Sequence, residues 1–476
     1  MRTRRWKWLA GLGLAAGLTA LPAQAAGFAP CGDAGDFAEL AGSQCAAMDV
    51  PLDHARPDDG QRLQLFVRKF PAEGRRRGAI WLVAGGPGES GASFYPLLPT
   101  LRRSFPGLDL LVPDHRGTGL SGRLCPDEEA VAGAGGAALE GAEWGSCFGR
   151  LGADPARARA FGIGNAARDL AGLIGHFRDD GPVYLYGVSY GTQLVLRTLQ
   201  LGDQGLRGVI LDSLVPPETD PRWDLSRRSE LVDAVGRQVL AACEAEPACR
   251  GGAEGSAEAR YRRVLAMAAQ QPAPAWRAQI PGRDPRAFFG SLLDVPELRR
   301  RLPALLADLD AGRGEVLQQV LARQRAIGEA MGRYPQSPLS IPLVQIVSAS
   351  ENTLRPGLTA AQVEQEAQGL LFTSVLPGLL AEPSLPRYPR DAAWGRQPDR
   401  LPPTLVLHGT LDPKTAWPGA QAHAALLRPH GRLGLLAVEG APHFILWAAP
   451  DCFQRAARAF VAAGRPRDGR CSAAAG

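Results

Sequence analysis

The chain has 476 residues, of which 45% are hydrophobic and 21% are charged. This composition supports a large buried core and excludes a disordered or collagen-like chain. The formal net charge of +5 includes four cations among the first seven residues, so the rest of the chain is close to neutral. The sequence has no lysine- and arginine-rich stripe with interleaved aromatic residues, and we therefore expect no nucleic-acid partner.

Residues 1–25 have the pattern of a secretory signal peptide. A basic start precedes an apolar run from Trp8 to Leu21, and Ala23-Gln24-Ala25 has the small-x-small form of a cleavage site. The run is shorter than the ~20 residues that span a membrane, and no later segment is long and apolar enough. We predict a secreted or periplasmic protein with no membrane span in the mature chain; a membrane anchor and twin-arginine export are alternatives.

The chain contains eight cysteines, an even number, as expected where disulfides persist. Counting does not determine their connectivity, but they fall into four couples of near neighbours along the chain. We predict these four pairings: Cys31–Cys45, Cys125–Cys147, Cys243–Cys249 and Cys452–Cys471. Zinc is disfavoured because the sequence has neither a C-x-x-C pair nor H-E-x-x-H.

Residues 26–215 alternate short apolar runs with glycine-bearing loops and helical stretches. Such alternation predicts βαβ units on a mostly parallel sheet. Expected strands occupy 47–52, 63–70, 79–83, 108–112, 183–186 and 208–212, and expected helices occupy 166–177 and 190–201.

This alternation stops within residues 216–399, which read as amphipathic helices broken by proline-bearing loops. Examples of the expected helices are 298–309 and 315–331. Strand signals return in residues 400–476, at 404–408 and 434–438, followed by a helix at 452–463. We therefore predict one α/β core in two parts, 26–215 and 400–476, with 216–399 inserted as a helical cap.

Residues 187–191, Gly-Val-Ser-Tyr-Gly, have the G-x-S-x-G form of a nucleophile elbow. They follow the apolar run 183–186 and precede a helical stretch, which is the strand–turn–helix context that the motif requires. Small residues on both sides let neighbouring elements approach the sharp turn. We predict that Ser189 is a nucleophile and not a plain turn serine.

A serine nucleophile needs a base within hydrogen-bond reach and a carboxylate that orients this base. In this architecture the order along the chain is serine, acid, histidine. Three of the seven histidines follow a well-placed acid. His443 comes directly after a strand, where catalytic loops gather, whereas His423 and His430 lie in or beside a helical stretch. We predict His443 as the base and Asp412, in the loop after strand 404–408, as the acid.

Catalysis also needs N–H donors for the developing oxyanion. We expect the amide of Tyr190, directly after the nucleophile, and that of Gly86, in the glycine-rich loop after strand 79–83; Gly85 is the alternative. The G-x-G-x-x-G run at 117–122 also matches a dinucleotide-binding fingerprint. Arg123, Cys125 and Pro126 follow it where an apolar helix should pack, so we discount this interpretation.

Together these residues resemble the α/β-hydrolase-fold serine aminopeptidases, which include prolyl iminopeptidases and, more closely, secreted tripeptidyl aminopeptidases. The resemblance spans most of the chain outside the cap and rests on five segments: AGGPGESG at 84–91, DHRGTGLS at 114–121, GVSYGTQL at 187–194, GTLDP at 409–413 and GAPH at 440–443. It implies an α/β-hydrolase fold with a mostly parallel sheet and an inserted helical cap. It also implies that Asp114 and Arg116 tie loops together beneath the active site.

The chain departs from the family pattern at two places. The family often has His before the Gly-Gly-Pro-Gly run, where this chain has Ala84. In the cap, residues 348–351, Ser-Ala-Ser-Glu, stand where the secreted branch tends to show a Cys followed by an acid. A buried carboxylate is a natural partner for an ammonium group, so Glu351 is a candidate to bind the free α-amino group of a substrate. A solvated acid is the alternative.

The leading hypothesis is an exported serine aminopeptidase that acts on a peptide with a free N-terminus through an acyl-enzyme on Ser189. A carboxylesterase is the first alternative, because the same triad cleaves esters and the cap selects the substrate. A noncatalytic binding protein of the same fold is disfavoured by the presence of Ser189, Asp412 and His443. We predict no metal and no cofactor.

Overall fold

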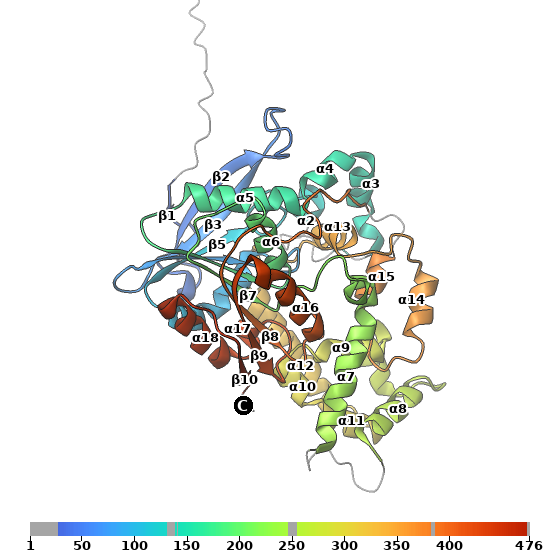
Figure 1. Cartoon of the computed structure of the whole chain (residues 1–476). Coiled ribbons are helices and arrows are strands. Elements are labelled where there is room, and N and C mark those ends of the chain that lie inside the picture. Colours follow the sequence, from blue (N-terminus) through green and yellow to red (C-terminus); the bar gives the residue numbers. More distant parts are fainter. Residues whose placement is uncertain (1–26, 131–138, 140, 246–254, 382–385, 474–476) are drawn as a thin grey trace, which may run out of the picture.

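The computed structural model describes residues 27–130, 139, 141–245, 255–381 and 386–473 (Figure 1). The predicted signal peptide therefore lies outside the described residues. Ten strands form one sheet in the order β1-β2-β3-β5-β4-β6-β7-β8-β9-β10. The strands are β1 (Ala29–Pro30), β2 (Gln44–Pro51), β3 (Arg62–Phe70), β4 (Gly78–Val83), β5 (Leu108–Asp114), β6 (Val183–Val188), β7 (Gly208–Asp212), β8 (Leu401–Gly409), β9 (Gly431–Glu439) and β10 (Gly469–Ser472).

All neighbouring strands from β5 to β10 are parallel, whereas β1, β2 and β3 pair antiparallel. The mostly parallel sheet predicted from the βαβ rhythm is therefore confirmed. The helices that accompany the sheet are α1 (Leu98–Ser104), α2 (Pro126–Glu129), α3 (Gly145–Ala153), α4 (Pro155–Ala160), α5 (Ile163–His176), α6 (Tyr190–Leu199), α16 (Trp417–Leu427), α17 (Ile445–Ala448) and α18 (Pro450–Ala463).

Both faces of the sheet are buried because successive strand residues point to opposite sides. In β4, Trp81 and Val83 belong to the cluster that contains residues of α5 and α6. Ile80 and Leu82 belong to the cluster on the other face, with residues of α1 and α18. Central strands such as β4 and β6 are buried throughout, which explains why they read as continuous apolar runs.

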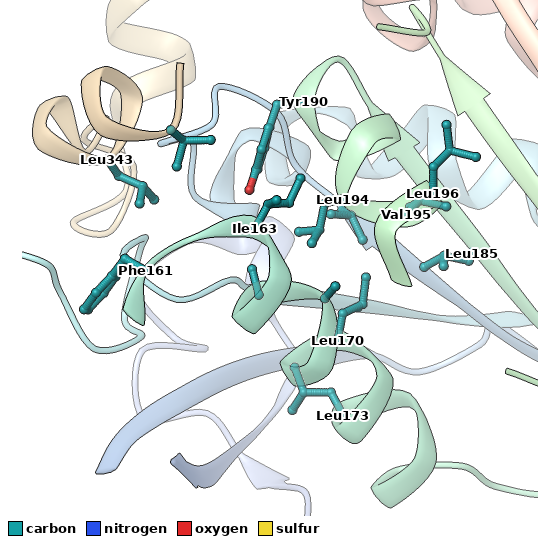
Figure 2. Close-up of a cluster of buried hydrophobic side chains, with 14 of the residues drawn as sticks. Phe161, Ile163, Leu170, Leu173, Leu185, Tyr190, Leu194, Val195, Leu196 and Leu343 are labelled. Atoms are coloured by element: carbon teal, nitrogen blue, oxygen red, sulfur yellow. The ribbon is translucent and has the colours of Figure 1, made fainter. Parts of the chain in front are cut away.

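The helices on one face also join the core to the segment inserted between β7 and β8. Figure 2 shows Leu170 and Leu173 of α5 facing Leu194 of α6. Leu343 from the inserted segment belongs to the same cluster as Tyr190, which directly follows the predicted nucleophile. The turn that carries Ser189 thus packs against both parts of the molecule.

The segment between β7 and β8 is helical and contains a cluster of its own, with Val232, Tyr261, Phe289, Leu305 and Phe372 among its buried residues. In Figure 1, α7, α8, α9 and α11 lie to one side of the sheet. The helices of this segment are α7 (Arg228–Ala245), α8 (Ala257–Ala268), α9 (Pro285–Leu292), α10 (Pro296–Arg300), α11 (Leu302–Asp310), α12 (Glu315–Gly332), α13 (Ile341–Glu351), α14 (Ala360–Ala367) and α15 (Leu376–Leu380). The division of the chain at residues 215 and 399 stays a prediction.

Two local predictions need correction. The expected single helix at 298–309 is wrong, because α10 ends at Arg300 and α11 begins at Leu302. Pro303 lies in the first turn of α11, where its missing N–H costs no helical bond, and its ring prevents the preceding turn from continuing. The short edge strand β10 was not expected, since Gly469–Ser472 has no apolar pattern.

Three of the predicted disulfides are present: Cys31–Cys45, Cys125–Cys147 and Cys452–Cys471. Cys249 lies outside the described residues, so its pairing with Cys243 stays a prediction. In the part of the chain that the structure describes, no helix combines the length and apolarity that a membrane span requires.

Candidate active site

Ser189 occupies the sharp turn between β6 and α6. Its backbone angles, φ 56° and ψ −127°, are unusual for a residue with a side chain. Such a conformation costs on the order of 1–3 kcal/mol and persists only where its surroundings enforce it. Here the Ser189 amide donates to the Asp212 carbonyl at 3.0 Å, and the Ser189 carbonyl accepts from the Thr192 amide at 2.8 Å. The turn presents the serine at the carboxyl end of the sheet.

The flanking glycines are required by close packing. A Cβ atom at Gly187 would lie within 2.5 Å of the Gly191 carbonyl oxygen, and one at Gly191 would lie 2.5 Å from the Val83 carbonyl oxygen. Both distances are far below an ordinary contact, so the backbone would have to shift. The glycines of the motif therefore bring the loop after β4 close to the serine.

Asp412 and His443 lie in the loops after β8 and β9 and form a buried pair. Nδ1 of His443 lies 2.7 Å from Oδ2 of Asp412. Burial by itself raises the pKa of Asp412, but the attraction and hydrogen bond of His443 outweigh it and hold this pKa well below its usual range. Asp412 is therefore a carboxylate, and it leaves Nε2 of His443 as the nitrogen free to exchange a proton.

Three further hydrogen bonds fix the Asp412 carboxylate. The backbone amides of Lys414 and Thr415 donate to Oδ1 at 2.7 and 2.8 Å. The hydroxyl of Thr415 donates to Oδ2 at 2.8 Å. His408 lies behind this group, with Nε2 at 3.6 Å from Oδ2 and at 2.8 Å from the Thr415 carbonyl. Burial lowers the pKa of His408, so it is a neutral neighbour.

A buried acid that the sequence analysis missed anchors the loop of His443. Asp212, at the end of β7, accepts hydrogen bonds from the amides of Ile445 and Leu446 at 2.8 and 2.9 Å. The hydroxyl of Ser213 accepts from the amide of Phe444 at 2.8 Å. These bonds fix the three residues that follow His443. The sequence shows Asp212 at the end of an apolar strand run. It does not show the partners of Asp212, because Ile445 and Leu446 lie more than 200 positions further along the chain.

The two predicted oxyanion donors lie beside Ser189. Tyr190 is the first residue of α6, and the first amides of a helix have no intrahelical acceptor. Gly86 has φ +107°, which favours glycine, and a Cβ at Gly85 would lie 3.0 Å from the Cβ of Ser189. The glycine loop thus approaches the serine closely.

A cavity of about 380 Å³ opens at this point. Its core lining includes Gly86, Ser189, Tyr190 and Asp412, and one face of α7 closes the other side. Among the described residues the Ser189 hydroxyl makes no hydrogen bond. A hydrogen bond between this hydroxyl and His443 therefore stays a prediction.

Glu351, the predicted ligand of a substrate amine, is the last residue of α13 and is not among the residues that line this cavity. It is 2% exposed and lies 3.5 Å from the guanidinium of Arg197. Burial raises the pKa of Glu351 to about 7, against the opposing attraction of Arg197. Its contact with substrate stays a prediction. Glu218, which the sequence analysis missed, does line the cavity and lies 3.7 Å from Arg197.

Asp114 and Arg116 tie loops together, as the resemblance implies. Arg116 forms two hydrogen bonds with Asp169, at 2.6 and 2.7 Å. Asp114 accepts from the hydroxyl of Ser90 at 2.9 Å and from the amide of Gly91 at 2.7 Å. Both residues are buried, so they act as loop supports beneath the site.

No metal site stands out in the described part of the chain. The group there with suitable ligand atoms is Cys31, Asp33 and Cys45. Its two sulfurs are joined in a disulfide, and Asp33 forms an ion pair with Arg68 at 2.6 Å. The donor atoms are therefore already engaged.

The model of the family described as alpha/beta hydrolase fold matches residues 78–450. The chain belongs to this family. Its relatives include the serine protease Hip1 of Mycobacterium tuberculosis and that of Mycobacterium bovis, each 26% identical over 467 residues, which is 90% of this chain and 87% of the relative. The family match and these relatives support a serine hydrolase of this fold.

Solved structures similar to this chain include a thermophilic esterase from Thermogutta terrifontis and an epoxide hydrolase from an endophytic Streptomyces. The esterase is 14% identical, with 88% of this chain and 99% of that chain covered and a TM-score of 0.38. The epoxide hydrolase is 19% identical, with 91% and 99% covered and a TM-score of 0.38.

Proposed function

We propose that this protein is a serine aminopeptidase that attacks the carbonyl of a peptide near its free N-terminus. The observation that carries the proposal is the strained elbow serine beside a cavity, together with the buried pair of Asp412 and His443, whose Nδ1 and Oδ2 atoms are 2.7 Å apart. Ser189 is the nucleophile, His443 the base and Asp412 the residue that orients this base.

In the first half of the reaction, the Ser189 hydroxyl adds to the carbonyl carbon while its proton passes to Nε2 of His443. The amides of Gly86 and Tyr190 donate to the oxyanion that forms. His443 then returns the proton to the leaving amine, the C–N bond breaks, and the acyl group remains on Ser189. A water molecule, deprotonated by His443, hydrolyses this ester and regenerates the serine.

Recognition of a free amine is supported by an excess of acid beside the cavity. Arg197 is buried among three carboxylates, with Asp391 at 2.7 Å, Glu351 at 3.5 Å and Glu218 at 3.7 Å. Asp391 and Glu218 outnumber this one cation, and Glu351, whose pKa is raised to about 7, adds negative charge as it loses its proton near neutral pH. Glu218 also borders the cavity. We propose that Glu218 binds the ammonium group of the substrate. Glu351 adds to the negative electrostatic potential around this group or contacts the amine directly.

Export is supported by the three disulfides, which persist in oxidising compartments. With the signal-peptide pattern of residues 1–25, they favour a secreted or periplasmic protein.

One comparison tests the activity. The purified protein is given three matched substrates: a free-amine peptide reporter, its N-acetylated form and a short acyl ester. We expect the free-amine peptide to be hydrolysed at least tenfold more efficiently than the acetylated one, and Glu218→Gln to reduce this ratio. Efficient ester hydrolysis with no peptide cleavage would identify a carboxylesterase instead, and no turnover of any substrate would favour a noncatalytic protein.

A further inference from the structure

One face of α7 forms the wall of the cavity opposite the elbow. Arg228, Leu231, Val235 and Gln238 all line the cavity, and their spacing of three or four residues places them on one side of the helix. This wall begins with a cation, continues with the apolar Leu231 and Val235, and ends at the polar Gln238. The guanidinium of Arg228 and the hydroxyl of Ser189 therefore border the same cavity.

The other charged side chains that line the cavity already have partners. Arg227 pairs with Glu230 at 2.8 Å and Lys414 pairs with Asp294 at 2.7 Å. Arg222 pairs with Asp220 at 2.6 Å. The remaining acids accept hydrogen bonds: Asp224 from the amide of Ser226, Glu218 from the amide of Gly395, and Asp412 from the amide of Thr415.

Arg228 differs from all of them. Among the described residues it has neither a hydrogen bond nor an ion pair within 4.0 Å, although its side chain is half-buried. Burial lowers the pKa of Arg228 to about 10, against the attraction of Asp412 and Asp294, so the group stays a cation at neutral pH. The oxygens of Asp412 are engaged by His443, Thr415 and Lys414 and leave no direct partner for it.

We propose that Arg228 binds a carboxylate of the substrate and gives the enzyme a preference for acidic peptides. A planar guanidinium offers paired donors that match a carboxylate, and the preference arises because an enclosed cation without a partner gains most from an anion. The carboxylate has two possible sources, an acidic side chain or a free C-terminus near the scissile bond. The inference builds on the peptide substrate of the proposed function.

Binding to the inactive Ser189→Ala protein tests the proposal without requiring turnover. Calorimetry gives the Kd of short free-amine peptides in matched pairs, Glu against Gln within the peptide and free carboxylate against carboxamide at its end. We expect at least one carboxylate member to bind tenfold or more tightly than its neutral partner, and the pair that does so identifies the source. Arg228→Gln should abolish the difference, whereas the matched control Arg237→Gln, on the same helix but outside the cavity lining and paired with Asp233, should retain it.

Equal affinities within both pairs, or no binding of any peptide, would overturn the proposal. Arg228→Gln weakening both members of a pair equally would also overturn it, because this outcome means that Arg228 acts through Asp412 or the cavity shape. Failure of the proposed function gives a different result: peptides bind with the expected preference, but the protein with an intact Ser189 does not cleave them.

Discussion

At the residue scale, the site depends on groups held in positions that they would not adopt alone. Ser189 is kept in a strained conformation by backbone hydrogen bonds to Asp212 and Thr192. Asp412 is kept ionised although it is buried, because His443 and two backbone amides compensate for lost hydration. Preorganisation of this kind is what acyl transfer requires.

Asp412→Asn tests the orienting role. An amide in place of the carboxylate favours the wrong tautomer of His443, so we expect kcat to fall on the order of 10⁴-fold, as at the acid of other serine triads. Asp220→Asn is the control, because Asp220 pairs with Arg222 and is not part of the cavity lining. A loss of less than tenfold in Asp412→Asn would assign the orienting role to a different carboxylate.

Glu351 makes a pH-dependent contribution to stability. Its pKa is raised from 4.5 to about 7 by burial, so the folded protein keeps a proton that the unfolded chain releases. Stability from this group is fully present below pH 4.5 and is lost as the pH rises through about 7. The free energy of unfolding, relative to Glu351→Gln, should fall by roughly 3 kcal/mol between these limits. Urea unfolding of both proteins at pH 5 and 8 measures this; a constant difference would contradict the buried, proton-binding state.

The triad candidates were accessible from the sequence because each stands directly after an apolar strand run, and parallel strands bring such ends together. The surroundings of Glu351 could not be predicted from the sequence. Its partner Arg197 lies 154 positions away on α6, and no local pattern signals that contact. Arg228 was also missed. It stands out only because the other charged residues of the cavity have partners, and the sequence does not show those pairs.

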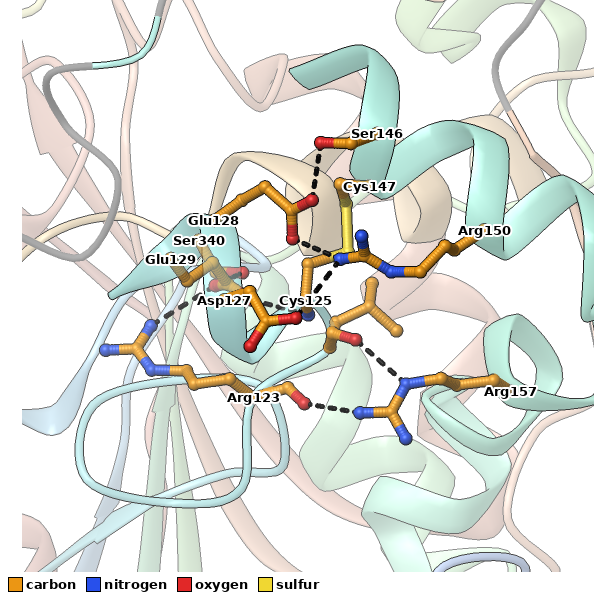
Figure 3. Close-up of a disulfide and its surroundings, with 11 residues drawn as sticks. Arg123, Cys125, Asp127, Glu128, Glu129, Ser146, Cys147, Arg150, Arg157 and Ser340 are labelled. Atoms are coloured by element: carbon orange, nitrogen blue, oxygen red, sulfur yellow. Dashed lines mark hydrogen bonds and ion pairs between the residues drawn. A yellow bond between two sulfur atoms is a disulfide. The ribbon is translucent and has the colours of Figure 1, made fainter. Parts of the chain in front are cut away.

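At the element scale, the disulfide Cys125–Cys147 belongs to a network that reaches the oxyanion loop (Figure 3). Glu129 of α2 accepts from the amide of Cys125 at 2.8 Å and from the hydroxyl of Ser340 at 2.6 Å. The amide of Ser340, at the start of α13, donates to the carbonyl of Gly88 at 3.0 Å. The inserted segment is thus tied to the loop that contains Gly86.

Ser340→Ala tests this connection. Loss of a hydrogen bond to a buried carboxylate costs about 1.5–3 kcal/mol, so we expect a lower Tm. The variant keeps the backbone amide that donates to Gly88 but is no longer anchored to Glu129, and we expect kcat to fall roughly tenfold because the oxyanion loop is held less firmly. The matched control is Ser146→Ala, whose hydroxyl donates to Glu128 and not to Glu129 (Figure 3). It should leave kcat unchanged. Equal effects of the two substitutions on kcat would mean that the network does not act on the oxyanion loop.

Element boundaries were predicted unevenly. The strand at 208–212 matches β7, because a buried parallel strand is one apolar run. The helix expected at 298–309 was wrong because its apolar spacing continues across Pro303, and the break depends on backbone geometry that periodicity ignores.

At the scale of the whole molecule, loops at the carboxyl end of the parallel sheet and one face of α7 line the same cavity, so we propose that the loops carry out catalysis and that α7 selects the substrate. The loops after β4, β6, β8 and β9 carry Gly86, Ser189, Asp412 and His443, while α7 faces them across the cavity. The mostly parallel sheet was predicted from the βαβ rhythm and is confirmed, whereas the division at residues 215 and 399 stays a prediction. The sequence did not predict which helix face lines the cavity, because that depends on how α7 packs.

The central claim is that Ser189 is the activated nucleophile. Reaction of the protein with a serine-directed fluorophosphonate, followed by peptide mapping, tests it most directly. We expect one covalent adduct, on Ser189, and no adduct in Ser189→Ala protein of unchanged Tm, because this substitution removes the hydroxyl without opening a core cavity. An adduct on another residue, or equal labelling of the variant, would contradict the account.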